Sequence, residues 1–207
     1  MIQKYIVASK KILFEGDGYS EAWHKEAEKR GLPNLKTTPV ALDAMVTDKA
    51  KKLFKDNGIY SHAELEARHE IELEKYIKKV QIEARVMGDL ATNHIIPAAI
   101  KYQNELLKNV NLLRDAALPE KLYKGQLTLL KDVSTHIQQV YDNVYEMVEA
   151  RKVANNIVDT REKAIAYEAK VKAQYFDKIR YHVDKLEQLV DDELWTLPKY
   201  RELLFLR

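Results

Sequence analysis

The chain has 207 residues, of which 46% are hydrophobic and 32% are charged, and its 34 lysines and arginines nearly balance its 32 aspartates and glutamates. The hydrophobic content excludes a disordered chain, and the lack of cysteine excludes disulfides and thiolate metal sites. Charges of both signs are mixed throughout and no apolar run approaches the ~18 residues of a membrane span, so neither a nucleic-acid nor a membrane partner is expected. The N-terminus has no signal-peptide pattern, and we expect a cytoplasmic protein.

Residues 1–60 are predicted to form short helices joined by turns. Four of the six glycines fall in this part of the chain, and glycine interrupts regular structure. Residues with strong capping preferences mark the helix boundaries. The first predicted helix, 2–11, lacks an N-cap, which indicates the end of a longer helix. The others are 21–30 between Ser20 and Gly31, one with Thr38 as N-cap and Pro39 as first residue, and 47–56 before Asn57-Gly58.

A much longer helix is predicted to begin at Ser61. Ser61-His-Ala-Glu64 is a capping box, with a serine at the cap and a glutamate three residues later. The helical pattern then runs to about Arg114, with Pro97 expected to kink it, because proline removes one amide donor and clashes with the preceding turn. Its apolar stripe alternates by four and three residues, as in a heptad repeat, and comprises Leu73, Ile77, Val80, Ala84, Met87 and Ala91.

Two further long helices follow the break at Ala116–Pro119. The second long helix has a predicted apolar stripe of Tyr123, Leu127, Leu130, Ile137, Tyr141, Val144 and Val148. The pattern weakens around 155–160, and a third helix then carries Phe176, Ile179, Val183, Leu186, Val190 and Leu194 on one face. A short last helix is predicted after Leu197-Pro198.

These patterns predict an all-α protein. Residues 61–207 are expected to form an elongated bundle of long antiparallel helices with coiled-coil-like packing, preceded by the short helices of 1–60. Met87 and Ile137 lie centrally in their stripes and are predicted to be buried. The same stripes are equally suited to helices from another subunit, so periodicity leaves both arrangements open.

Two Glu-x-x-His motifs have the spacing used in di-metal carboxylate bundles. Glu66/His69 and Glu21/His24 each place two metal-binding side chains on one helix face. Such a site also needs a glutamate from each of two other helices, and the neighbours of Glu66 are mostly charged. The spacing therefore favours solvated surface charge over a metal centre, and no metal ligand is assigned.

Two other features have residue types that could bind a ligand. His94 continues the apolar stripe of the first long helix, where a ligand or switch role competes with the commoner hydrogen-bonded core histidine, with Asp89 and Asn93 as candidate partners. Gly16-Asp17-Gly18 resembles the start of a phosphate-binding loop but lacks a third glycine and a preceding strand, which favours a turn. No catalytic or cofactor-binding residue is assigned in this chain.

Three long segments carry a family resemblance. They are 12–20 (ILFEGDGYS), 81–97 (QIEARVMGDLATNHIIP) and 179–195 (IRYHVDKLEQLVDDELW). In this order they resemble the C-terminal region of type III glutamine synthetases, the large bacterial form. The similarity is strong over 1–114 and 174–207 and looser over 115–173.

The resemblance implies a parent enzyme that ligates ammonia to glutamate with ATP, through γ-glutamyl phosphate, in a large homo-oligomer of hexameric rings. The family's motifs for binding ATP and a divalent metal such as magnesium are not found in this sequence, so they would lie in a preceding catalytic domain. The chain is then expected to be a non-catalytic C-terminal helical domain for assembly or regulation, inactive alone, without a cofactor of its own. Its partners would be that catalytic domain and other subunits. Two alternatives are a free-standing helical adaptor and a di-metal bundle enzyme.

Overall fold

The computed structural model describes residues 2–205 and begins with short helices. Local features mark the helix boundaries. At the start of α2 (Glu21–Lys29) the Trp23 amide donates to Ser20 Oγ at 3.3 Å. Gly31 and Gly58, which come just after helices, adopt positive φ values of 66° and 65°. Two predictions change: Thr37 rather than Thr38 precedes its helix, and the helix predicted over 2–11 ends at Ala8 and is followed by a 3-10 turn. The elements are α1 (Ile2–Ala8), a 3-10 turn (Lys10–Ile12), α2 (Glu21–Lys29), α3 (Thr38–Leu42), a 3-10 turn (Asp43–Val46) and α4 (Asp48–Asp56).

The remaining elements are long. Ser61 forms the predicted capping box with Glu64 at the start of the first of them. They are α5 (His62–Leu90), a π-helix (Ala91–Ile95), α6 (Ile96–Asp115), a 3-10 turn (Glu120–Leu122), α7 (Lys124–Asn155), α8 (Thr160–Ala166), a second π-helix (Tyr167–Phe176), α9 (Asp177–Leu189) and the short α10 (Tyr200–Leu203). Val190 and Leu194, which were predicted on the third helix, lie beyond its end, because Val190 adopts an extended conformation.

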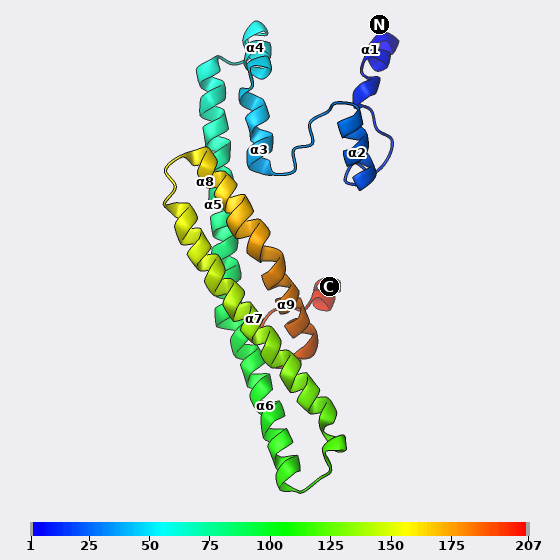
Figure 1. Cartoon of the computed structure of the whole chain (residues 1–207), viewed down its shortest axis with the longest axis vertical. Coiled ribbons are helices and arrows are strands. Elements are labelled where there is room, and N and C mark those ends of the chain that lie inside the picture. The colour runs from blue at the N-terminus through cyan, green and yellow to red at the C-terminus, as the bar shows by residue number, and fades with distance from the viewer. Residues whose placement is uncertain (1, 206–207) are drawn as a thin grey trace.

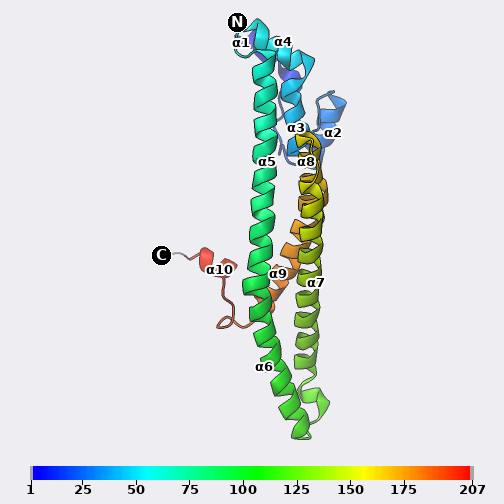
Figure 2. The same cartoon turned by 90° about the vertical axis from the view of Figure 1, so that its left-hand side faces the viewer.

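Within residues 2–205 the long elements form three antiparallel segments and there is no strand, which confirms the predicted all-α bundle. The first segment, α5 to α6, is a continuous helix of 54 residues. Segment α7 returns beside it, and α8 to α9 runs back along both (Figures 1 and 2). The third segment is the shortest, so most of α6 and only the first turns of α7 continue beyond it as a two-helix hairpin (Figure 1).

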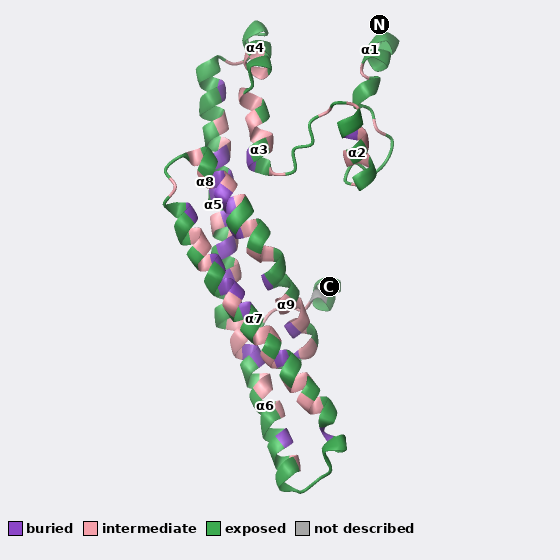
Figure 3. Cartoon of the chain, in the orientation of Figure 1, coloured by how far each residue is buried: buried purple, intermediate pink, exposed green. Residues whose placement is uncertain are grey.

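The core lies along the facing sides of these segments (Figure 3). In the first segment the predicted stripe is correct for five of its positions, which are at most 6% exposed: Leu73, Ile77, Val80, Ala84 and Ala91. Met87, predicted to be buried, is instead half-buried at the edge of this core.

The predicted stripe of the second long helix is correct at Tyr123 and Val144, which are 7% and 5% exposed, but its central positions are wrong in register. Ile137 is half-buried rather than buried, and Tyr141 is 56% exposed. The buried positions repeat every seven residues and are Val133, Val140, Met147 and Ala154, joined by Val144. Because α7 packs between two neighbouring segments, apolar residues occupy a wide face, and several adjacent stripes fit the same periodicity.

The turn before Pro97 is π-helical. Proline has no amide hydrogen, so it cannot donate to the carbonyl of Asn93, and the helix widens over Ala91–Ile95. Thr92 Oγ1 donates to the Gly88 carbonyl at 2.9 Å within the same turn. Figure 2 shows α6 inclined to α5 beyond this point, which is the change of direction that Pro97 predicts.

Candidate functional site

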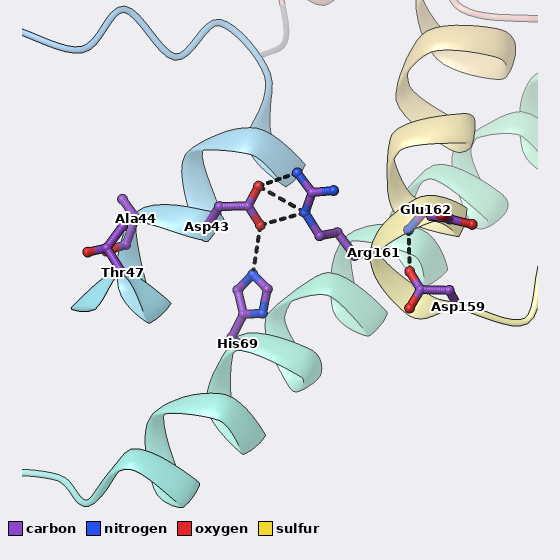
Figure 4. A network of polar contacts seen from close by, with 7 residues as sticks. All are labelled: Asp43, Ala44, Thr47, His69, Asp159, Arg161 and Glu162. Carbon is purple, nitrogen blue, oxygen red and sulfur yellow. Dashed lines mark hydrogen bonds and ion pairs between the residues drawn. The ribbon is translucent and has the colours of Figure 1, made fainter. Parts of the chain in front are cut away.

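A polar junction joins three elements that are far apart in the sequence (Figure 4). Asp43 opens the 3-10 turn after α3, His69 lies on α5 and Arg161 lies in the first turn of α8. The Arg161 Nε donates to both Asp43 carboxylate oxygens at 2.9 Å, and its Nη2 donates to Oδ2 at 2.6 Å. His69 Nε2 lies 3.2 Å from Asp43 Oδ1. An ionised carboxylate only accepts, so His69 carries its proton on Nε2.

Local structure holds Arg161 in place. The Asp159 carboxylate accepts the Glu162 amide at 2.8 Å as the N-cap of α8, which fixes the turn that presents Arg161. The hydrogen bond from Arg161 lowers the pKa of Asp43, and its charge and His69 act in the same direction against burial. This arrangement keeps Asp43 ionised. Its bonds to His69 and Arg161 connect the end of α3 to α5 and α8 of the bundle.

A groove of about 510 Å³ lies beside the junction, and it contains both residues of the first Glu-x-x-His motif. Their side chains have separate partners: Glu66 pairs with Lys51 at 2.7 Å, whereas His69 pairs with Asp43. The second motif, Glu21/His24, forms a 3.6 Å contact within its own helix. No three His, Cys, Asp or Glu side chains gather as a potential metal site among the described residues.

The two other candidates also have structural explanations. His94 is half-buried, but the buried stripe passes from Ala91 to Ile95 through the π-helix, so His94 lies beside it. Its expected partners Asp89 and Asn93 bind each other at 2.5 Å. The Gly16–Gly18 segment is the predicted turn, in which the Asp17 carboxylate accepts the Tyr19 amide at 2.9 Å.

A histidine pair between α7 and α9 was missed by the sequence analysis. The Nδ1 atoms of His136 and His182 lie 2.9 Å apart, so one ring donates its Nδ1 proton to the other. Tyr181 packs edge-on against both rings. Burial lowers the pKa of His182, and the nearby His136 lowers it further. The two histidines are 46 residues apart, and no local pattern signals their contact.

A polar network that links the three long segments was also missed. The Tyr167 hydroxyl donates to Asn155 Oδ1 at 2.5 Å, and Gln81 Nε2 donates to the same oxygen at 2.8 Å and to the Tyr167 hydroxyl at 2.9 Å. Tyr167 is fully buried, so these bonds satisfy a hydroxyl that would otherwise destabilise the core. One residue comes from each long segment, which fixes their register.

Comparison with known proteins identifies the family of the chain. Residues 1–114 match the family model described as glutamine synthetase C-terminal domain. The chain belongs to this family. Its match ends at 114, the point where the resemblance stated above becomes looser.

Similar proteins carry the same family name. The chain is 45% identical to a glutamine synthetase of Bacteroides fragilis (strain YCH46) over 208 residues, 99% of this chain. It is 32% identical over its full length to a type-3 glutamine synthetase of Dictyostelium discoideum, and 30% identical over 99% of its length to a glutamine synthetase of Butyrivibrio fibrisolvens. It spans only 28–29% of the length of these relatives. The resemblance to the C-terminal region of glutamine synthetase is confirmed.

Among residues 2–205 of this glutamine synthetase C-terminal domain, no helix combines the length and apolar character needed to cross a membrane.

Proposed function

We propose that this domain is a non-catalytic assembly element of a type III glutamine synthetase. The parent enzyme would ligate ammonia to glutamate with ATP in the cytoplasm, and its ATP and divalent metal would bind in a catalytic domain outside this chain. Here the domain would contact that catalytic domain and other subunits. Its relatives' names and its small share of their length support this assignment.

The observation that carries the proposal is the presence of apolar pairs on the outer surface of the bundle. Ile82 and Val86 on α5 are 62% and 50% exposed, and Tyr141 and Tyr145 on α7 are 56% and 62% exposed. Each pair has i,i+4 spacing and so forms a continuous strip on one helix face. Adjacent exposed apolar and aromatic side chains are typical of surfaces that meet another protein.

The ion pairs and polar networks described above support the same role. They join side chains of the domain to one another, across α3, α5 and α8 and across the three long segments. Such contacts make a stiff scaffold that holds the outer apolar strips at fixed positions.

Truncation of the full-length enzyme tests this proposal. We expect removal of residues 61–207 to change the oligomer, measured by size-exclusion chromatography with light scattering. A matched control is the full-length enzyme with Asp substituted for Tyr19, which is 96% exposed and outside the bundle. An unchanged oligomer with unchanged glutamine synthesis in the truncated enzyme contradicts an assembly role.

A further inference from the structure

Asn57 and Gly58 form the one Asn-Gly pair in the sequence. Asparagine is a thermolabile residue, because the backbone nitrogen of the next residue can attack its side-chain amide. A side chain on that next residue obstructs the attack, and glycine has none. The pair therefore has the residue types that favour spontaneous deamidation.

The pair is also open to solvent. Both residues are exposed at the C-terminal end of α4, a helix with no buried residue. This helix lies at one end of the molecule, next to the start of α5 (Figures 1 and 2). A Cβ atom added to Gly58 would meet no atom within 4 Å, so no side chain packs on that side of the turn. Water therefore reaches the pair, and the geometry of the turn decides whether it reacts.

The reaction has two steps. The Gly58 nitrogen attacks Asn57 Cγ, and the new N–Cγ bond closes a five-membered imide ring. The Cγ–Nδ2 bond breaks, and Nδ2 leaves as ammonia with the proton of the Gly58 amide. Water then opens the imide: cleavage of the new N–Cγ bond gives aspartate, whereas cleavage of the original peptide bond to Gly58 gives isoaspartate.

The folded conformation of the turn holds the reacting atoms apart. Ring closure needs the Gly58 nitrogen and Asn57 Cβ on the same side of the bond between Cα and the carbonyl carbon. At the Asn57 ψ of 3° the Gly58 nitrogen is instead eclipsed with the backbone nitrogen of Asn57. Cβ is another substituent of the same tetrahedral carbon, so about a third of a turn in ψ separates the folded conformation from a reactive one.

Two hydrogen bonds maintain this unreactive conformation. Asn57 Nδ2 donates to the Leu53 carbonyl at 2.8 Å, which directs the side chain back along α4. The Gly58 amide donates to the Lys55 carbonyl at 3.0 Å, as expected for a glycine that ends a helix. The attacking nitrogen and the leaving amide are thus both engaged, and both bonds must break before the ring can close.

Tyr60 holds this turn against its neighbours. Its ring centre lies 5.6 Å from that of Phe54 on α4, and the Arg68 guanidinium of α5 lies 4.5 Å from it on the other helix. Tyr60 is half-buried, and the turn before it has no buried residue. A helix end with so few buried contacts opens at a lower free-energy cost than the core.

We propose that Asn57-Gly58 is a deamidation site that reacts when the C-terminal turn of α4 opens. The inference is independent of the assembly role. A carboxylate at position 57 cannot donate to the Leu53 carbonyl, and it places a negative charge at the unfavourable end of the helix dipole. The modification therefore converts a transient opening into a lasting one.

The test incubates the 207-residue chain in mildly alkaline buffer and follows aspartate and isoaspartate at position 57 by peptide mass spectrometry. A synthetic peptide of residues 53–61 gives the rate without the fold. We expect the chain to react measurably, but at least about tenfold more slowly than the peptide. Asn104, an exposed asparagine followed by glutamate, should stay unmodified over the same period.

Tyr60→Ala tests the control by the turn. Loss of the two ring contacts should raise the rate in the chain about fivefold, relative to a peptide with the same substitution. Lys75→Ala, at an exposed residue of α5 that pairs with Glu72, should leave the rate unchanged. Asn57→Asp copies one product, and it should raise hydrogen exchange in 48–56.

Three outcomes overturn the proposal: a chain that stays unmodified after the peptide has reacted completely, equal rates in the chain and the peptide, or a relative rate that Tyr60→Ala leaves unchanged. Unchanged hydrogen exchange in Asn57→Asp would overturn the stated consequence for α4.

Discussion

His136 on α7 and His182 on α9 share one hydrogen bond between their Nδ1 atoms, at 2.9 Å. This bond needs one protonated and one unprotonated nitrogen. If both rings become doubly protonated, each Nδ1 carries a proton, so the bond is lost and two positive charges face each other. The other groups at this contact are Tyr181, which packs on both rings, and Lys185, whose ammonium lies 5.6 Å from the Tyr181 ring centre. A further cation disfavours a second positive charge.

The first prediction follows from this pair. The folded pKa of His182 is below its ordinary value of 6.5, so its contribution to stability is complete above that pH and is lost as pH falls towards the folded pKa. We expect the melting temperature to fall on acidification from pH 7.5 to 5.5, and His136→Gln to flatten this dependence. Differential scanning calorimetry of both proteins measures it. His62→Gln, at an exposed position, should keep the parent slope.

The second prediction compares two methionines in the same bundle. Met147 is fully buried, whereas Met87 is half-buried at the edge of the core. Met147→Ala should lower the free energy of unfolding by about 2–5 kcal/mol, because it leaves a cavity, and Met87→Ala should cost clearly less. Urea unfolding followed by circular dichroism measures both. Equal losses would contradict the register of α7 described above.

The third prediction concerns the Asp43–Arg161 ion pair. Both side chains are partly exposed, at 28% and 48%, so a double-mutant cycle with alanine should give a coupling of about 1 kcal/mol. Hydrogen exchange should rise in 38–56 when Asp43 is replaced, because α3 loses its fastening. Since the pKa of Asp43 is lowered, this stabilisation is present above its ordinary value of 3.8 and disappears as pH falls through the folded value.

A control cycle is available for that experiment. Glu72 and Lys75 form an exposed pair within α5, at 2.6 Å, and connect no separate elements. Their replacement should leave exchange in 38–56 unchanged. If it rises equally there, the effect of Asp43 is a general loss of stability rather than release of α3.

The fourth prediction concerns activity. The isolated chain should form no γ-glutamyl hydroxamate from glutamate, ATP and hydroxylamine, because the proposed catalytic groups lie outside it. The measurement compares purified protein with a mock preparation. Activity that follows the protein through purification would show that this domain contributes catalytic groups of its own.

Helix boundaries were predictable because they depend on neighbours in the sequence. Ser20, Ser61 and Gly58 act through hydrogen bonds or backbone conformations within a few residues, and the structure places helix ends where these residues indicated. The stripe of α5 was also largely correct, since it has one clear apolar face.

The register of α7 and the polar contacts between helices depend on packing that the sequence does not show. Val140 and Ile137 fit the same heptad rhythm, and only the positions of two neighbouring segments decide which is buried. Asp43 and Arg161 are separated by 118 residues, and their contact depends on the loops between them. No spacing rule connects such residues.

The π-turn before Pro97 has a mechanical consequence. Helix α6 has 20 residues, so it forms an arm of about 30 Å between this turn and the hairpin tip. A change of about 5° in the inclination of α6 would carry the tip through about 3 Å. If two subunits bound the bundle on either side of Ala91–Ile95, a small rotation of α6 at one contact would produce a larger displacement at the other.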